Sequence, residues 1–409
     1  MNATNTKFIL TPKTCAKWSA CIYVLVSKAF FPIGYLNGSI QLGFLLLTVL
    51  FTVWMDHGKP KLNKFLICEI IFIVVTALTS LLVAQSRDWV FNCVQNLLYG
   101  MLFGYAMIRI STEERSVDWF VKSLVSAGLI LVGYIILTGG YSVGRLARIT
   151  TGEGMNANTL GVFLSFAVWG TLYLISVYIK NTNRVVASFS IGIITVSLFL
   201  YVIIGTGSRK SFIASLFVIV FWIVFAMIPS FKQISFLRKL ISFAIATGLI
   251  VLVFQRFGRF FVNISTTLTT RMKQLSDENG IDLHRLDLII DAFRVFFNHP
   301  IIGVGWNNYR LYSIFSQYSH CSYVEVLACT GIVGSFLAYY LWGIQIRYII
   351  SFIKLRVDKI LATNLIALMG LFIFINLVQI MYYNTSLLMI MHLIICIPLV
   401  QSIRVQTSN

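Results

Sequence analysis

Charged residues are scarce in this chain, making up 11% of its 409 residues. Hydrophobic residues make up 58%, and the mean hydropathy is +0.85. Soluble globular domains carry roughly 25% charged residues, so this composition excludes a soluble fold. We expect an integral membrane protein in which residues 1–409 form a single membrane domain.

Other sequence signals are also missing. The seven cysteines form no Cys-x-x-Cys pair, which argues against a metal cluster and against a disulfide framework. No internal repeat or low-complexity linker divides the chain, and no small-residue cleavage site follows the first apolar stretch. The net charge is +18, yet no aromatic and basic module typical of RNA or DNA binding is present. Nucleic acid is therefore not an expected partner.

Apolar windows of about 20 residues, the length that crosses roughly 30 Å of hydrocarbon as a helix, recur along the chain. We therefore expect an all-α fold of about 12 transmembrane helices. They are predicted at 18–36, 39–55, 65–84, 89–109, 117–138, 159–179, 185–204, 211–228, 240–255, 322–345, 360–380 and 384–402. Lys28 interrupts the first window and is expected to snorkel, and Glu69 is interpreted as architectural.

Basic residues are distributed unevenly between the two sets of loops. More than half of the 32 lysines and arginines fall in short loops on one side, so the positive-inside rule predicts that both termini are cytoplasmic. The opposite loops favour arginine over lysine, which that rule does not explain. Arginine binds phosphate through a planar fork of donors. The bias therefore indicates a polyanionic ligand on the outer face.

The one large loop predicted between spans covers residues 256–321 and would lie outside the cytoplasm. Within it, residues at about 283–297 place apolar side chains on one helical stripe, which predicts an amphipathic helix on or capping the membrane domain. Pro300 is expected to end that helix, and Gly303 and Gly305 to allow a turn.

Two short outer segments carry candidate ligand-binding residues. Ser208-Arg209-Lys210 begins the eighth predicted helix, and a helix N-terminus with an arginine is an anion site. An ordinary helix boundary with interfacial anchors is the alternative. Near the sixth helix, Asn158 is a plausible cap and Asn156 lies in a turn. Asparagine also suits sugar hydroxyls because it donates and accepts hydrogen bonds.

The stretch SQYSHCSYVEV places His320 at the border between the large loop and the tenth predicted helix. Histidine is the usual general base near neutral pH, although a hydrogen-bonded interfacial residue is an equally simple interpretation. Glu325 lies inside the helix, where an ionisable group is a functional candidate. The other four histidines, His57, His284, His299 and His392, lack comparable neighbours and are interpreted as structural.

The order of these motifs resembles the bacterial O-antigen ligase and polysaccharide polymerase superfamily. It comprises Asn158, Ser208-Arg209, Arg285, NHPIIGVGWNNY, His320 with Tyr323, and the GIVG segment 331–334. In that family a His-Asn-x-Tyr-(Leu/Ile)-(Glu/Gln) segment ends a large loop, and a glycine turn begins eleven residues after the histidine, as it does here. The match covers about residues 145–345. Cys321 stands where asparagine is usual, and Cys329 stands where an acidic residue is frequent.

The resemblance implies a fold like the C-type membrane glycosyltransferases, and an active site on the outer face of the bacterial plasma (inner) membrane. The implied reaction is metal-independent and cofactor-free transfer of sugars from an undecaprenyl-diphosphate-linked oligosaccharide. Arg209 and Arg285 would bind the diphosphate, and His320 would be the catalytic base. The implied sugar contacts are Arg148, Asn156, Asn158 and Glu325.

Three functions stay open at this point. A polymerase of O-antigen, capsule or exopolysaccharide would use a second lipid-linked repeat unit as acceptor, whereas an O-antigen ligase would use lipid A-core. The TGSRK and YSHxxYVE motifs look more like those of the polymerases. A lipid-linked oligosaccharide flippase is the third alternative, although no repeat is visible and the arginines lie at the outer edge. A chain-length regulator and a separate flippase are the implied protein partners.

Overall fold

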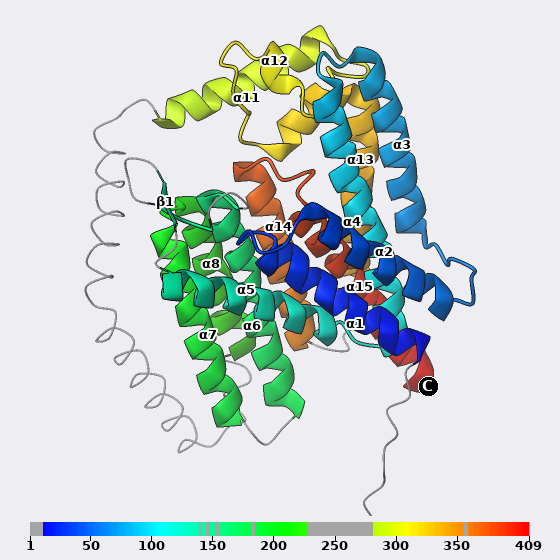
Figure 1. Ribbon diagram of the computed structural model, residues 1–409, viewed down its shortest axis with the longest axis vertical. Helices are drawn as coiled ribbons and strands as arrows, with labels where there is room; N and C mark the ends of the chain where they lie inside the picture. The colour runs from blue at the N-terminus through cyan, green and yellow to red at the C-terminus, as the bar shows by residue number, and fades with distance from the viewer. Residues whose placement is uncertain are drawn as a thin grey trace, which may run out of the picture.

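The computed structural model describes residues 11–138, 141–143, 148–151, 155–181, 185–227, 281–354 and 359–408. Long helices dominate these ranges (Figure 1). They are α1 Pro12–Leu25, α2 Gly38–Met55, α3 Lys64–Val83, α4 Arg87–Glu114, α5 Asp118–Thr138, α6 Ala157–Asn181, α7 Val185–Gly205, α8 Arg209–Trp222, α11 Ile281–Asn298, α13 Ser322–Lys354, α14 Lys359–Val378 and α15 Thr385–Ser408. A short helix, α12, spans Tyr309–Tyr312.

The chain is a multi-pass membrane protein. Within the described ranges, nine helices are long and apolar enough to cross a membrane. The window predicted at 18–36 overlaps α1 only at residues 18–25, and the window at 89–109 lies within α4. Neither helix is among these nine: α1 has 14 residues, and α4 carries several amide side chains. The window at 240–255 lies outside the described residues. The expected count of 12 spans is therefore not confirmed.

One pair of short strands adds to the helices. β1, Tyr141–Val143, pairs antiparallel with β2, Arg148–Thr150, just before α6 begins. The sequence analysis expected no strand here, because three residues are too short to show a period-two pattern. The fold is otherwise helical throughout the described ranges.

The two ends of the bundle differ in what covers them. At one end, called the α11 end below, α11 and α12 lie across the ends of α3 and α13 (Figure 1). Ser80 near the end of α3 accepts a hydrogen bond from the Trp306 backbone N–H at 3.0 Å. Ser86, before α4, donates its backbone N–H to Asn308 at 2.8 Å. These bonds tie the segment after α11 onto the bundle.

The opposite end carries ion pairs. Arg109 donates to Asp56 at 2.7 Å, and Lys17 lies 3.1 Å from Glu114. Burial raises the pKa of Asp56, but hydrogen bonds from Arg109 and Tyr105 outweigh it, so that pKa lies below its ordinary value. Arg109 and Lys17 are thus paired with carboxylates of the protein itself.

The first helix starts earlier than predicted and ends differently. Thr11 accepts a hydrogen bond from the Thr14 backbone N–H, and Pro12 occupies the first helical turn, two standard start signals. After α1 the chain continues as a π-helix, η1 Val26–Phe30, which contains Lys28. Lys28 is 3% exposed and donates to the Thr385 hydroxyl at 2.6 Å. The expectation that it snorkels to the surface is wrong, because its ammonium is held inside the bundle by the half-buried Thr385 hydroxyl.

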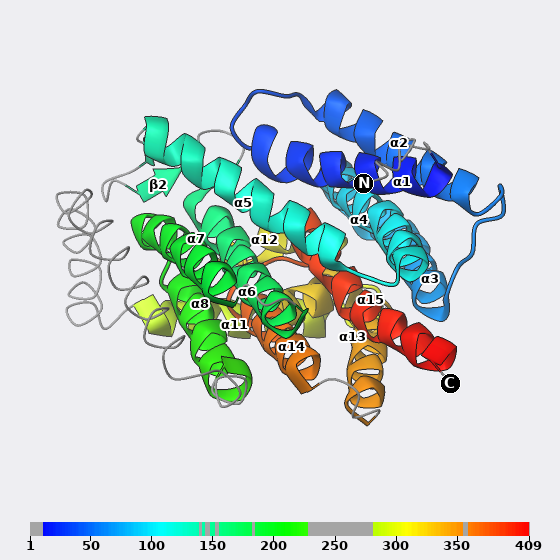
Figure 2. The same cartoon turned by 90° about the horizontal axis from the view of Figure 1, so that it is seen from below.

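Helices distant in sequence pack closely inside the bundle. α1 lies along α2 at one edge, and α6, α7 and α8 form a group at another (Figure 2). α15 packs along α4, where a side chain at Gly100 would collide with Leu388 and one at Gly104 would collide with His392. These two glycines therefore set how closely α4 and α15 approach.

α13 is broken near its start by Gly331, whose φ of 61° and ψ of −162° are not helical. The loop after α11 inserts at this break. Val304 and Gly305 donate backbone N–H groups to Ala328 and Cys329, and Pro300 and Ile301 accept from residues after the break. Gly303 and Gly305 have positive φ, as the predicted turn requires. The HPIIGVGW loop, residues 299–306, is thus hydrogen-bonded to the backbone on both sides of the break at Gly331.

Candidate functional site

His320 lies in a tight turn at the α11 end, two residues before α13 begins. It is half-buried and has a positive φ of 57°, as has Ser316 at 52°. A non-glycine residue in this left-handed region costs about 1–3 kcal/mol and persists only where the surroundings hold it. The local fold therefore holds the histidine in one defined orientation.

Glu325 hydrogen-bonds the turn that carries His320 from its buried side. Its side chain is fully buried, and its Oε2 atom accepts hydrogen bonds from the backbone N–H and the hydroxyl of Ser319, both at 2.9 Å. The Oε1 atom has no hydrogen-bond partner among the residues that the structure describes. The sequence suggested a sugar contact for Glu325, whereas its observed contacts are with the turn that carries His320.

Arg209 is the first residue of α8, at the same end of the bundle. Its neighbour Ser208 is buried and hydrogen-bonds Ser211 at 2.9 Å, which anchors the helix start. Arg209 itself forms no ion pair within the part of the chain described. Its guanidinium and the free N–H groups of the first turn make this helix start suited to an anion.

The α14–α15 connection, residues 379–384, joins the Arg209 and His320 segments. Lys210 Nζ lies 3.4 Å from the Val378 carbonyl, just before this connection. The Ser322 hydroxyl donates to the Gln379 carbonyl at 2.8 Å and accepts from the Met381 N–H at 2.9 Å. Both segments therefore border one short stretch of chain, although 111 positions separate residues 209 and 320 in the sequence.

Arg285 lies on α11 and is exposed. α11 is fixed by other residues: Tyr309 donates to Asp291 at 3.0 Å, and Arg294 donates to Asp291 at 2.7 Å and to the Tyr312 carbonyl. Burial raises the pKa of the Tyr309 phenol above its ordinary value, so it stays a donor. Arg285 is thus available to a ligand, on a helix that is firmly attached.

The apolar stripe of α11 points away from the protein. Leu286, Ile290 and Phe297 are more than half exposed, while the opposite face buries Leu288, Ala292 and Val295. A helix at the end of a membrane bundle that exposes such a stripe matches an interfacial helix lying against lipid.

The asparagines before α6 have roles different from those expected. Asn156, not Asn158, caps the helix: its Oδ1 accepts from the Thr159 backbone N–H at 2.9 Å. Asn158 lies in the first turn of the helix. The cap was predicted at Asn158, two residues too late, because Asn156 and Asn158 are the same residue type. Arg148 pairs with Val143 in the short strands, and its side chain lies outside the described residues.

Arg310 is a residue that the sequence analysis did not single out. Its guanidinium lies between two rings, 3.6 Å from the centre of Trp89 and 4.8 Å from that of Tyr318. Such stacking is favourable for a cation and fixes Tyr318, two residues before His320. In the sequence, Arg310 was marked only by the preference for arginine in the outer loops. Its contact with Trp89 was not visible, because the two residues are more than 200 positions apart.

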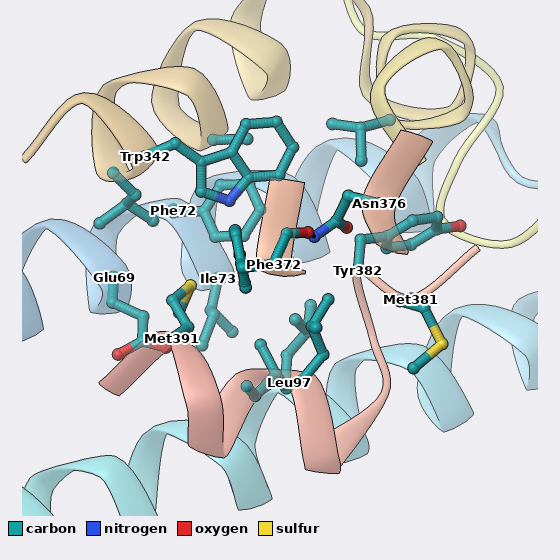
Figure 3. Close-up of a pocket in the computed structure, with 15 residues that line it drawn as sticks. Glu69, Phe72, Ile73, Leu97, Trp342, Phe372, Asn376, Met381, Tyr382 and Met391 are labelled. Carbon is teal, nitrogen blue, oxygen red and sulfur yellow. Dashed lines mark hydrogen bonds between the residues drawn. The ribbon is translucent and has the colours of Figure 1, made fainter. Parts of the chain in front are cut away.

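An apolar cavity lies between α3, α13, α14 and α15 (Figure 3). Trp342, Phe72 and Phe372 line it, with Met381 and Tyr382 from the α14–α15 connection. Glu69 lines its other side, and its Oε2 lies 2.9 Å from His392 Nε2. His392 therefore has the acidic neighbour that the sequence analysis did not assign to it.

No group of three or more histidine, cysteine, aspartate or glutamate side chains in the described ranges is arranged to hold a metal ion. Arg209, Arg285 and Arg310 lie at the α11 end, together with the exposed carboxylates Asp88 and Asp287. The arrangement can bind an anion at the start of α8, next to a turn that presents a histidine.

Comparison with known proteins agrees with these motifs. Residues 194–339 match the family described as O-antigen ligase. This segment includes Arg209, Arg285, His320 and Glu325, and it excludes Arg148, Asn156 and Asn158. A search of curated proteins found no match. The match over residues 194–339 supports the resemblance of this segment to the O-antigen ligase and polysaccharide polymerase superfamily.

Proposed function

We propose that this protein polymerises undecaprenyl-diphosphate-linked oligosaccharide repeat units into a surface polysaccharide. The observation that carries the proposal is the α14–α15 connection, which borders both the Arg209 and the His320 segments within the family-matched region. The lipid-linked character of the substrate follows from the family and from the membrane fold. The α11 end would face away from the cytoplasm, and both termini would be cytoplasmic.

The chemistry assigned to these residues is a displacement at the anomeric carbon of the donor. His320 accepts the proton of an acceptor sugar hydroxyl as its oxygen attacks that carbon. The bond between the anomeric carbon and the diphosphate oxygen breaks, and undecaprenyl diphosphate leaves. Arg209 and Arg285 stabilise the negative charge that grows on the leaving group, a role that preorganised arginines fill well.

The diphosphate would lie at the start of α8. Arg209 supports this placement because no carboxylate of the described residues neutralises it, in contrast to Arg109 at the opposite end. The exposed stripe of α11 would rest on the outer leaflet and hold Arg285 at headgroup depth. Asn156, Asn158 and Arg148 stay weaker candidates for sugar contacts, since Asn156 is already engaged as a helix cap.

Ligation to lipid A-core is the second candidate, because the matched family is described as O-antigen ligase. The two differ in the acceptor and not in the residues assigned above. In either case a flippase would supply the lipid-linked substrate to the outer face. A chain-length regulator is proposed as a further partner of a polymerase.

The test is purified full-length protein in lipid vesicles with undecaprenyl-diphosphate-linked repeat units alone. We expect the wild type to form a ladder of longer saccharides on a gel. His320→Ala should slow the ladder by about 100-fold or more, because a positioned general base contributes about 10²–10⁴-fold. His299→Ala, an exposed histidine at the same end, is the matched control and should retain the wild-type rate.

Each other outcome decides against part of the proposal. Transfer only after lipid A-core is added would mean ligation. Movement of the substrate across the bilayer without any new glycosidic bond would mean a transporter. A wild-type ladder from folded His320→Ala protein would remove His320 from the reaction.

A further inference from the structure

A second cavity opens at the α11 end, outside the residues assigned above. It lies between η1, α2, α4, α6 and the start of α15, and its volume is about 570 Å³. Small-molecule sites typically measure about 300–1,000 Å³, so the cavity is large enough for a ligand. Lys28, Thr159 and Thr385 are among the residues that line it.

The lining is unusually rich in amide side chains for a membrane protein. Five of the lining residues are asparagine or glutamine: Gln41, Asn92, Gln95, Asn96 and Asn384. An amide side chain both donates and accepts hydrogen bonds, which is what a ring of sugar hydroxyls requires. Hydroxyl groups from Ser39, Thr159 and Tyr99 add further donors and acceptors. The cavity is therefore suited to a carbohydrate more than to a lipid tail.

Lys28 adds a positive charge to this neutral lining. Its Nζ donates to the Thr385 hydroxyl at 2.6 Å, which leaves further ammonium donors for other acceptors. Within the described ranges it forms no ion pair, and none of the residues lining the cavity is an aspartate or a glutamate. A buried cation without an acidic partner is unfavourable, and inside a membrane bundle it indicates a functional site.

The cavity is connected to the His320 segment. Residues 379 and 381 hydrogen-bond Ser322, next to His320, while Asn384, Thr385 and Ser386 line the cavity. Thr159, on the far wall, is hydrogen-bonded to Asn156 at the start of α6. A saccharide seated here would thus lie alongside the α14–α15 connection that borders the reaction site.

We propose that this cavity is a saccharide subsite and that Lys28 pairs with a carboxylate on one sugar of the bound chain. The inference rests on the proposed function for the origin of the saccharide, but binding itself needs no catalysis. It assigns a substrate class to the protein: repeat units that contain an acidic sugar. The acid could also be the phosphate of a lipid headgroup, and the experiment must separate these two sources.

The experiment measures binding of two sugars that differ in one group, methyl glucuronide and methyl glucoside, to the full-length protein in nanodiscs by ligand-observed NMR. We expect the glucuronide to bind about tenfold more tightly or better, because a hydrogen bond to a charged group is worth about a factor of ten. Lys28→Met should reduce that ratio to about one. Lys122→Met, at an exposed lysine of α5 that does not line this cavity, should leave the ratio unchanged.

Two further variants separate the binding proposal from a folding failure and from the catalytic role of His320. Asn92→Asp adds a negative charge at an exposed wall residue, so it should abolish the glucuronide preference even if Lys28→Met does not fold. His320→Ala should bind both sugars like the wild type, which separates this inference from the catalytic proposal. Equal affinity of the wild type for the two sugars, or no binding of either, would overturn it. Displacement of the glucuronide by inorganic phosphate or by phosphatidylglycerol at equal concentration would assign Lys28 to a headgroup instead.

Discussion

Two glutamates, Glu69 and Glu325, are buried in the helical bundle with opposite surroundings. Glu69 is 2% exposed and lies 2.9 Å from His392, whose other ring nitrogen donates to the Leu388 carbonyl at 2.7 Å. Glu325 is fully buried, and among the described residues its side chain bonds only the neutral Ser319 and its Oε1 has no partner. The first carboxyl joins α3 to α15, whereas the second joins the start of α13 to the turn that carries His320.

The difference separates a structural role from a functional one. A buried carboxyl with a histidine partner can share a proton with it, and Gly104 makes room for that ring. A buried carboxyl held only by a serine is less completely satisfied, and such an arrangement is tolerated mainly where function requires it. We therefore propose that Glu325 positions His320 through the turn at Ser319, whereas Glu69 belongs to the bundle core.

The largest effect is expected for Glu69→Ala. Removing one partner of a buried ion pair leaves the other uncompensated and costs about 3–5 kcal/mol. We expect the free energy of unfolding in micelles to fall by that amount. Glu113→Ala, which removes a half-exposed partner of Arg109, should cost less than about 1 kcal/mol. Equal losses for the two variants would mean that the Glu69–His392 pair does not stabilise the bundle.

An intermediate effect is expected for substitutions of Glu325. Glu325→Ala removes two buried hydrogen bonds, each worth about 1 kcal/mol, so the ladder rate should fall by about 30-fold. Glu325→Gln keeps an oxygen that can accept from Ser319 and should stay within about tenfold of the wild type. The measurement is the initial rate of ladder formation. Should the glutamine variant be as slow as the alanine variant, the charge and not the hydrogen bonds would be what matters.

The smallest effect is expected for Ser319→Ala. The variant loses the hydrogen bonds of the hydroxyl to Glu325 and to the Cys321 backbone but keeps the backbone N–H bond to Glu325, so the turn is destabilised by about 1 kcal/mol. This corresponds to a rate lowered about fivefold, measured in the same ladder assay. Ser316→Ala, at an exposed position in the same segment, should have the wild-type rate. A Ser319→Ala rate equal to that control would show that the turn does not depend on the hydroxyl.

Local patterns explain what could be predicted. The hydrophobic windows located helices because membrane insertion depends on the composition of one segment at a time, and α3, α5, α13 and α14 lie where expected. The positive φ of Gly303 and Gly305 followed from their residue type. The cap of α6 was misplaced by two positions, since Asn156 and Asn158 are chemically equal and only the start of the helix distinguishes them.

Contacts between distant segments explain what could not be predicted. Nothing near Lys28 in the sequence indicates that Thr385 holds it, and nothing near His392 indicates Glu69, 323 positions away. The stacking of Arg310 between Trp89 and Tyr318 is of the same kind. In each case the residue type was visible, but its partner was not.

The sequence by itself determined that this protein is a helical membrane protein with an arginine-rich face and a histidine at a loop border, because hydropathy and charge are properties of short segments. The tertiary structure decided which buried polar groups are satisfied and which are left for a ligand. That decision depends on helix packing, which brings Glu69 to His392 and Lys28 to a cavity without acidic residues. Each pairing matters for stability, because a polar group buried in the bundle has no water to hydrogen-bond in place of a missing partner.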